Sequence, residues 1–307
     1  EEQEQLSVDY EKALKKYDHF PQPKISESNL RVELYPSQRD FRAEGFYWLK
    51  NKTQNPIAEI HIQENFQQKV ATDYLRFSSG EAKIKQRWKD FGYTIYTLAQ
   101  PLAAGDSLKM EFKVNFTTEG FTASMGNTDV VQNGTFFNNT YFPSLGYAAE
   151  VELGSDDLRR KYKLPEKERM MEQDDPRGLS QSLFGDDADY IRFQMVVGTE
   201  ADQIAIAPGY LQKEWTEKGR NYFQYAMDVP MVNFYSIVSA RYEVLRDTWQ
   251  NTSGETVKLE IYYHKGHEYN LDKMMASMKK SLEYYSKNFS PFQFRQMRIM
   301  EFPRYAS

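Results

Sequence analysis

Histidine is the residue type in this chain best suited to metal or acid–base chemistry, and two of the four histidines lie close together. His264 and His267 belong to the stretch HKGHE at residues 264–268. The known zinc-binding helix motif has the order H-E-x-x-H. Here the order is H-x-x-H-E, in an expected turn that contains Gly266, and no third ligand stands out. A metal site at 264–268 is therefore the weaker interpretation, and a strand-to-helix turn is the stronger one.

The other residues that could do chemistry have simpler explanations. His61 lies in the strand-like stretch EIHIQ and is expected to be exposed. The pairs Asp174–Asp175 and Asp186–Asp187 lie in charged stretches and are expected to be solvated. The chain has no G-x-S-x-G, no phosphate-binding loop and no G-x-G-x-x-G motif. Its own residues therefore show no catalytic machinery.

Composition narrows the function classes. The 307 residues include no Cys, which excludes disulfides, thiolate catalysis and cysteine-ligated metals. The net charge of −5 gives no reason to expect nucleic-acid binding. No apolar run has transmembrane length. Aromatic residues make up 15% of the chain, which favours sheets, where rings pack across strands.

Hydrophobic periodicity predicts a mainly β fold. Residues 1–20 suit a short helix or a tether, because Leu6, Tyr10, Leu14 and Tyr17 recur at helical spacing. From residue 29 the period becomes two, as in NLRVELY, and similar stretches follow to about residue 117. Strands resume after residue 189. We expect an antiparallel, saddle-like β domain with one face buried.

The middle of the chain breaks this pattern. Residues 117–150 are rich in Gly, Asn, Thr and aromatics, which is typical of edge strands and turns or of a ligand-facing surface. Residues 151–189 are heavily charged, and DDLRRKYKL could form a helix started by Ser155 or Asp156. We expect residues 151–189 to be a solvated surface insertion.

Near residue 268 the period becomes helical. Asn270 is a suitable N-cap for a helix with one apolar face, made of Leu271, Met274, Met275, Met278, Leu282, Tyr285 and Phe289. The closing stretch MRIMEFPRYAS reads as a strand that Pro303 ends. A helix and strand with nothing after them are the expected opening of a second domain.

The order of these segments resembles the aminopeptidase N family of zinc metallopeptidases. NLRVELYPSQRDFRAEGFYWLKNKTQNPIAEIHI is similar to the family's opening strands, and YTLAQPLAAGDSLKMEFKVNF to its next signature. VPMVNFYSIVSARYEV resembles the end of its β domain. MMASMKKSLEYYSKNFSPFQFRQMRIMEFPRYAS resembles the first catalytic-domain helix and the strand before the exopeptidase loop. The similarity covers most of residues 29–307.

The resemblance implies a zinc enzyme whose chemistry lies beyond Ser307. The family's amine-anchoring loop, its H-E-x-x-H helix, its third-ligand Glu and its Tyr follow that strand, and none is present here. We therefore expect no zinc binding and no peptidase activity from this chain alone. In the parent protein we expect zinc as cofactor and a peptide as substrate. A degenerate parent that kept the fold and lost the chemistry is the other possibility.

One departure points to a particular branch of the family. Phe142-Pro143 is present, but the Asp-x-Pro that typically follows is replaced by the charged residues 151–189. This combination looks most like the aminopeptidase-like module that some bacteria fuse to a transporter permease. The resemblance implies a periplasmic or extracytoplasmic module, tethered to the membrane through its N-terminal end.

The family also implies a contact from the β domain to the substrate. A Gln or Glu that lies several residues before the aromatic-Pro lines the pocket for the first side chain. Here that position falls near Gln132, Asn133 and Gly134, and the Gln132 amide could hydrogen-bond a substrate N-terminus. A plain turn is the alternative.

These observations predict three parts: a helix or tether at 1–28, the β domain at 29–265, and the start of a thermolysin-like domain at 266–307. The alternative from another class is a non-enzymatic β-rich module that binds peptide or carbohydrate, since aromatic faces stack on sugars. Such a module would not need the terminal helix and strand. The oligomeric state is not predicted.

Overall fold

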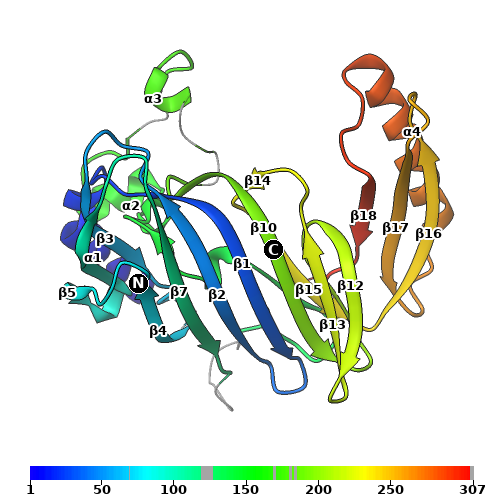
Figure 1. The fold of residues 1–307 in the computed structure, drawn as a ribbon, viewed down its shortest axis with the longest axis horizontal. Coiled ribbons are helices and arrows are strands. Elements are labelled where there is room, and N and C mark those ends of the chain that lie inside the picture. The colour runs from blue at the N-terminus through cyan, green and yellow to red at the C-terminus, as the bar shows by residue number, and fades with distance from the viewer. Residues whose placement is uncertain (69, 119–126, 169–170, 180–181, 183–184, 305–307) are drawn as a thin grey trace.

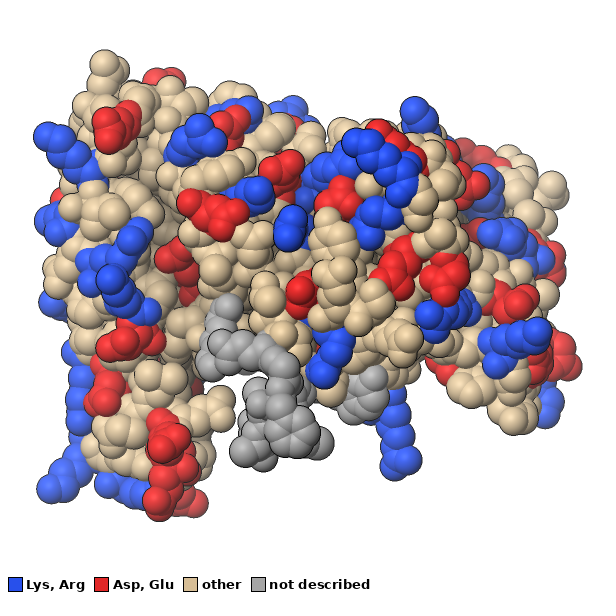
Figure 2. All heavy atoms as spheres, turned by 90° about the horizontal axis from the view of Figure 1, so that it is seen from below, with Lys and Arg blue, Asp and Glu red and all other residues tan. Residues whose placement is uncertain are grey.

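The structure is a computed structural model that describes residues 1–304 except 69, 119–126, 169–170, 180–181 and 183–184. Figure 1 shows a broad curved sheet, with helices at its N-terminal end and a separate helix–sheet unit at the other end. Among the described residues, no helix is long and apolar enough to cross a membrane. In Figure 2, Lys and Arg are interspersed with Asp and Glu over the underside, so no basic face stands out there.

The largest sheet confirms the predicted β fold. Its order is β12-β13-β10-β1-β2-β7-β4, with β14 beside β10. The bounds are β1 (Lys24–Tyr35), β2 (Asp40–Lys50), β4 (Ala71–Phe77), β7 (Ser107–Phe116), β10 (Ala188–Glu200), β12 (Tyr210–Glu217), β13 (Arg220–Ala226) and β14 (Met231–Val232). All these pairs are antiparallel except β1 with β10, which are parallel. The sequence pattern did not predict that parallel pair.

Two smaller sheets cover the inner face of the large one. One has the order β5-β6-β3-β9, from β3 (Ile57–Gln63), β5 (Lys83–Trp88), β6 (Tyr93–Leu102) and β9 (Ser144–Leu145). The other has the order β11-β15-β8, from β8 (Thr135–Asn138), β11 (Ile204–Ile206) and β15 (Ser236–Ala240). Short 3-10 turns, η2 (Lys89–Phe91) and η3 (Asn139–Tyr141), connect neighbouring strands.

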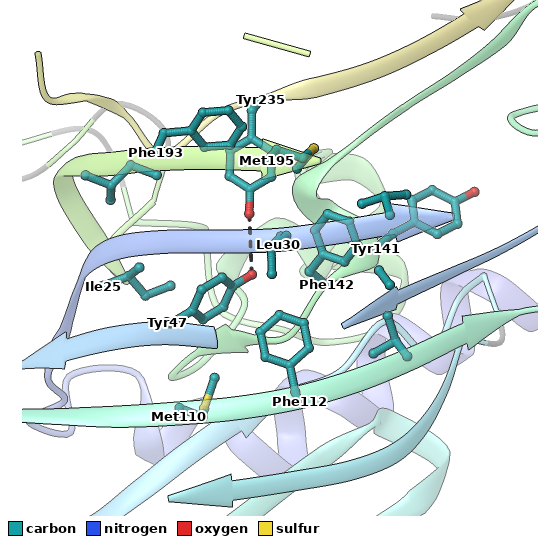
Figure 3. Close-up of a cluster of buried hydrophobic side chains, with 14 of the residues drawn as sticks. Ile25, Leu30, Tyr47, Met110, Phe112, Tyr141, Phe142, Phe193, Met195 and Tyr235 are labelled. Atoms are coloured by element: carbon teal, nitrogen blue, oxygen red, sulfur yellow. Dashed lines mark hydrogen bonds between the residues drawn. The ribbon is translucent and has the colours of Figure 1, made fainter. Parts of the chain in front are cut away.

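The core between these layers is rich in aromatic side chains (Figure 3). Alternate residues of β1, such as Leu30 and Val32, are buried there, as period-two spacing requires. Tyr47 on β2 and Tyr235 before β15 meet across the core, with their hydroxyls 3.5 Å apart. The Ser28 hydroxyl lies 3.2 Å from the Tyr235 hydroxyl, so these buried polar groups satisfy one another.

The N-terminal residues form a packed helix. α1 (Glu2–Leu14) and η1 (Lys15–Tyr17) pack on the β5-β6-β3-β9 sheet, and Tyr10 and Leu14 are fully buried. The prediction that His61 is exposed was wrong. Its ring is buried beside Tyr17 and Phe20, and its Nδ1 lies 2.8 Å from the Tyr93 hydroxyl. Tyr17 of η1 and Phe20 just after it supply the cover that strand periodicity could not reveal.

The charged residues 151–189 are not uniformly solvated, which corrects the sequence interpretation. They follow η4 (Ala149–Val151) and include α2 (Asp156–Lys161) and α3 (Pro176–Leu179). Ser155 occupies the N-cap position of α2 without a side-chain capping bond. Arg159 is buried and makes a bidentate pair with Glu11 of α1. Asp187 is also largely enclosed, whereas Asp186 is exposed as expected.

The C-terminal part is a helix packed on its own sheet. The strands β16 (Tyr242–Gln250), β17 (Thr256–His264) and β18 (Gln296–Met300) form the order β16-β17-β18, and α4 (Leu271–Asn288) lies against it. β17 and β18 are parallel, so the last strand is paired. The chain passes from the β15 sheet to this one at Arg241.

The predicted apolar face of α4 is buried only over its first turns. Met275, Met278 and Leu282 pack on the sheet, whereas Tyr285 and Phe289 are 59% and 74% exposed. Those two rings lie on the predicted apolar face, but outside the part of it that packs on the sheet. Asn270 stands at the N-cap position as predicted, but it has φ +57° and makes no side-chain capping bond.

Candidate functional site

The turn at residues 132–134 lies where the β domain meets the C-terminal unit. It leads directly into β8, whose strand is held by β15. The backbone carbonyl of Gln132 accepts a hydrogen bond of 2.8 Å from Nε2 of the buried Gln203. Gln203 in turn accepts one from the Ser239 hydroxyl at 2.8 Å. The turn is thus fixed from below by a buried polar chain.

Gly134 fixes the turn from the other side. Its φ of +128° is a conformation that side-chain-bearing residues rarely adopt. A Cβ built there would lie 2.6 Å from Cγ of Pro303. Next to this contact the rings of Phe136 and Phe302 stack with centroids 5.0 Å apart. The chain that leaves β18 is therefore packed directly onto the turn.

Asn133 has a structural role at the same junction. Its Oδ1 accepts the backbone N–H of Arg241 at 2.9 Å, at the point where the chain passes to β16. Its Nδ2 lies 3.5 Å from Nδ1 of His264. Asn133 and Gly134 thus hold the C-terminal unit, and the exposed Gln132 is the member of the trio with a free amide. Among described residues that amide has no hydrogen-bond partner.

The two clustered histidines meet Glu301 at the end of β18. The Glu301 carboxylate accepts the backbone N–H of His264 at 2.8 Å and also contacts the His267 ring. Burial alone raises the pKa of the Glu301 carboxyl, but the His264 amide and the His267 ring together lower it below its ordinary value. The Tyr242 hydroxyl donates to the Glu301 carbonyl at 2.6 Å.

This arrangement does not fit a zinc ion. The Glu301 oxygens already accept from the His264 amide and the His267 ring, and His264 turns its Nδ1 toward Asn133. A zinc site needs three or four convergent ligands. Within the described ranges, no group of three His, Cys, Asp or Glu residues is placed to hold a metal ion. The structure thus favours the turn interpretation of residues 264–268.

Comparison with known proteins gives a clear fold relationship without a close sequence relative. No protein-family profile matches the sequence, and no curated protein matches it significantly. The M1 zinc metallopeptidase from Deinococcus radiodurans aligns over 94% of this chain and 59% of its own, with 13% identity and a TM-score of 0.57. Legionella pneumophila aminopeptidase A, solved with aspartic acid, aligns over 96% of this chain and 30% of its own, with 13% identity and a TM-score of 0.60.

These matches confirm the predicted fold class. The chain has the mainly β architecture of the N-terminal β domain of M1 aminopeptidases. A two-domain M1 zinc metallopeptidase mutant bound to L-tryptophan aligns over 91% of this chain and 56% of its own length. The chain therefore spans about half the length of such two-domain proteins.

Proposed function

We propose that this chain is the substrate-framing N-terminal part of a zinc aminopeptidase-like protein. In this proposal the strands up to β15, with α1 packed on them, belong to its β domain, and the unit of β16, β17, α4 and β18 begins its catalytic domain. The zinc ligands belong to a part of the parent outside this sequence. Fold neighbours that are zinc metallopeptidases, one of them a mutant bound to a Tyr-Ser-Ala substrate, support this proposal.

The observation that carries the proposal is the position of Gln132. The turn holds its backbone rigid, and its side-chain amide is exposed and unpartnered among described residues. The turn contacts the chain just after β18, through Gly134 and Pro303. An amide at this place can accept a hydrogen bond from a substrate's ammonium group, which is a strong, charge-assisted interaction.

The test uses the parent protein that continues beyond Ser307. We expect it to contain stoichiometric zinc and to cleave amino-acid amides. Gln132→Ala should lower kcat/KM by about 10- to 100-fold, since a hydrogen bond to a charged group contributes about 1.5–3 kcal/mol. Gln38→Ala is the matched control, because Gln38 is exposed and lies on another turn. A parent without zinc and without cleavage would favour the non-enzymatic binding module instead.

Membrane tethering and an extracytoplasmic location belong to the same proposal. They rest on the resemblance to permease-fused modules, which the sequence of residues 117–189 suggests. Fractionating cells that express the parent protein tests this directly. Recovery in the soluble cytoplasmic fraction would remove the tethered form of the proposal and leave the enzymatic form standing.

A further inference from the structure

Three buried polar side chains form a line through the β domain that ends at the turn of residues 132–134. Thr199 lies near the end of β10, Ser239 lies on β15, and Gln203 lies in the turn between β10 and β11. None of the three is more than 1% exposed. Two hydrogen bonds of 2.8 Å join their side chains, and a third of 2.8 Å joins Gln203 to the Gln132 carbonyl. Burying these groups is costly unless they are bonded, so each contact in the line matters.

The chemistry of the groups fixes the direction of these hydrogen bonds. A side-chain amide has N–H donors on one atom and an acceptor oxygen on the other. The Gln132 carbonyl can only accept, so Gln203 turns its Nε2 toward it and its Oε1 toward Ser239. The Ser239 hydroxyl donates its single proton to Gln203 and therefore accepts from Thr199. Every bond runs the same way, from the large sheet to the backbone of the turn.

Gln203 is itself held in place on its backbone. Its N–H donates to the Glu200 carbonyl at 3.1 Å, and its carbonyl accepts the Asn221 side-chain amide at 3.2 Å. Its side chain is then fixed at both ends, by Ser239 and by the Gln132 carbonyl. A support anchored in this way transmits the position of the β domain to the turn.

The core contains another group of buried hydroxyls for comparison. Ser28, Tyr47 and Tyr235 contact one another inside the core. The line that contains Gln203 instead leaves the core and ends on the backbone of Gln132, whose side chain is exposed. The first group serves packing alone, whereas the second determines where an exposed amide lies.

From this geometry we propose that Gln203 is a positioning residue, which holds the Gln132 backbone so that its side-chain amide can meet the substrate's ammonium group. This inference rests on the proposed function, which gives Gln132 its substrate. Asn133 and Gly134 join the turn to the C-terminal unit, whereas Gln203 joins it to the β domain. The two supports therefore act from opposite sides of the turn.

The first measurement uses this chain and needs no activity. Gln203→Met keeps the approximate size of the side chain but removes the N–H that the Gln132 carbonyl accepts. NMR relaxation should show the backbone order parameter of Gln132 falling from about 0.85 to below about 0.6. Thr199→Val is the matched control, because it removes a hydrogen bond at the far end of the line and should leave Gln132 ordered.

A second variant keeps this measurement open if Gln203→Met fails to fold. Ser239→Ala removes the donor that holds Oε1 of Gln203, and it should lower the order parameter of Gln132 by a smaller amount. An unchanged order parameter at Gln132 in the folded Gln203 variant, or in the Ser239 variant where the first does not fold, would overturn the proposal.

The second measurement uses the parent protein and tests the consequence for substrate binding. The ammonium group is bound in the ground state and in the transition state alike, so Gln203→Met should raise KM about three- to tenfold and leave kcat nearly unchanged. In a Gln132→Ala background it should raise KM no further, because the amide that it positions is gone. Additive effects of the two substitutions would give Gln203 a purely structural role and overturn the proposal.

The single variants separate this inference from the proposed function. A raised KM in Gln132→Ala with an unchanged KM in Gln203→Met would overturn the positioning role and leave the proposed function standing. An unchanged KM in Gln132→Ala would remove the substrate contact itself, and the role of Gln203 with it. Gln38→Ala, on another turn, should change neither constant.

Discussion

Different interactions hold the helices in place at the two ends of the molecule. At the N-terminal end, α1 is held by a buried bidentate ion pair, with the Arg159 guanidinium 2.7 and 2.9 Å from the Glu11 carboxylate oxygens. The buried Tyr10 hydroxyl donates to Gln63 there at 2.8 Å. At the C-terminal end, α4 is held by apolar contacts of Met278 and Leu282 with its sheet.

This difference indicates which interactions fix the position of each helix on its sheet. A buried ion pair is directional; its desolvation offsets much of its attraction, and removing only one partner is strongly destabilising. Apolar burial is non-directional and scales with the area removed from water. Polar bonds therefore fix the register of α1 in addition to its buried Tyr10 and Leu14. α4 is fixed mainly by its methionine–leucine face, with one partly exposed ion pair between Lys279 and Asp247.

The largest effect on stability is expected from breaking the buried Glu11–Arg159 ion pair at the N-terminal end. Glu11→Ala should destabilise the fold by about 3–5 kcal/mol, because it leaves the Arg159 guanidinium buried and unpaired. Chemical denaturation measures this. Glu4→Ala, which breaks the more exposed Glu4–Lys161 pair, is the matched control and should cost far less stability than Glu11→Ala. A double variant, Glu11→Leu with Arg159→Met, should recover most of the loss.

The second-largest effect on stability is expected from a substitution in the apolar contact between α4 and its sheet. Leu282→Ala should cost about 2–5 kcal/mol through lost burial and the cavity it leaves. Hydrogen exchange should locate the loss in β16 and β17, with little change in β1 and β2. Leu179→Ala is the control, because Leu179 is 72% exposed. Uniform loss of protection across both ends would show that they unfold as one unit.

Lowering the pH should reduce the stability of the N-terminal end, where His61 is buried. Burial lowers the pKa of His61 to about 4, compared with 6.5 in an exposed chain. The folded state therefore favours the neutral ring, and its contribution is complete above pH 6.5 and falls as the pH drops toward 4. The loss should be about 3 kcal/mol. His61→Gln should flatten that part of the stability–pH curve; an unchanged slope would argue against a buried neutral His61.

A smaller effect concerns the junction between the two ends. Gly134→Ala should cost about 1–3 kcal/mol, from its positive φ and the contact with Pro303. Gly105→Ala is the control, since Gly105 has φ +80° but open space around it. Only the Gly134 variant should increase hydrogen exchange at the Glu301 amide. Equal exchange in both variants would assign the cost to φ alone.

The smallest effect on stability is expected at Tyr285, beyond the buried part of the apolar face of α4. Tyr285→Ser should change stability by no more than about 0.5 kcal/mol, because that ring is mostly exposed. Thermal denaturation beside the Leu282 variant makes the comparison direct. A cost near that of Leu282→Ala would mean that the exposed end of α4 is covered in solution.

Local patterns predicted the elements well because burial alternates with the period of each element. The buried residues Leu30 and Val32 follow the period of a strand in β1. The buried residues Met275, Met278 and Leu282 follow the period of a helix in α4. The same logic failed at Tyr285, since helical spacing continues past the point where the sheet beneath it ends. It also failed at His61, because the rings that cover it belong to a segment some forty residues away.

The candidate site was only partly readable from the sequence. Gln132, Asn133 and Gly134 came from a family resemblance, and nothing in their types separates an amide that fixes a junction from one that faces a ligand. The structure shows that Asn133 and Gly134 contact Arg241 and Pro303, which are distant in the sequence.

The parallel pairing of β1 with β10 has a consequence for the order of folding. β1 forms a hairpin with β2 early, but its other edge waits for β10, which pairs Leu30 with Met195. Contacts between residues so far apart close slowly, since a long loop must be ordered first. During synthesis, β1 therefore presents an unpaired edge until β10 arrives, and such edges invite pairing with other chains. A nascent chain stalled before residue 188 should be the form most dependent on chaperones.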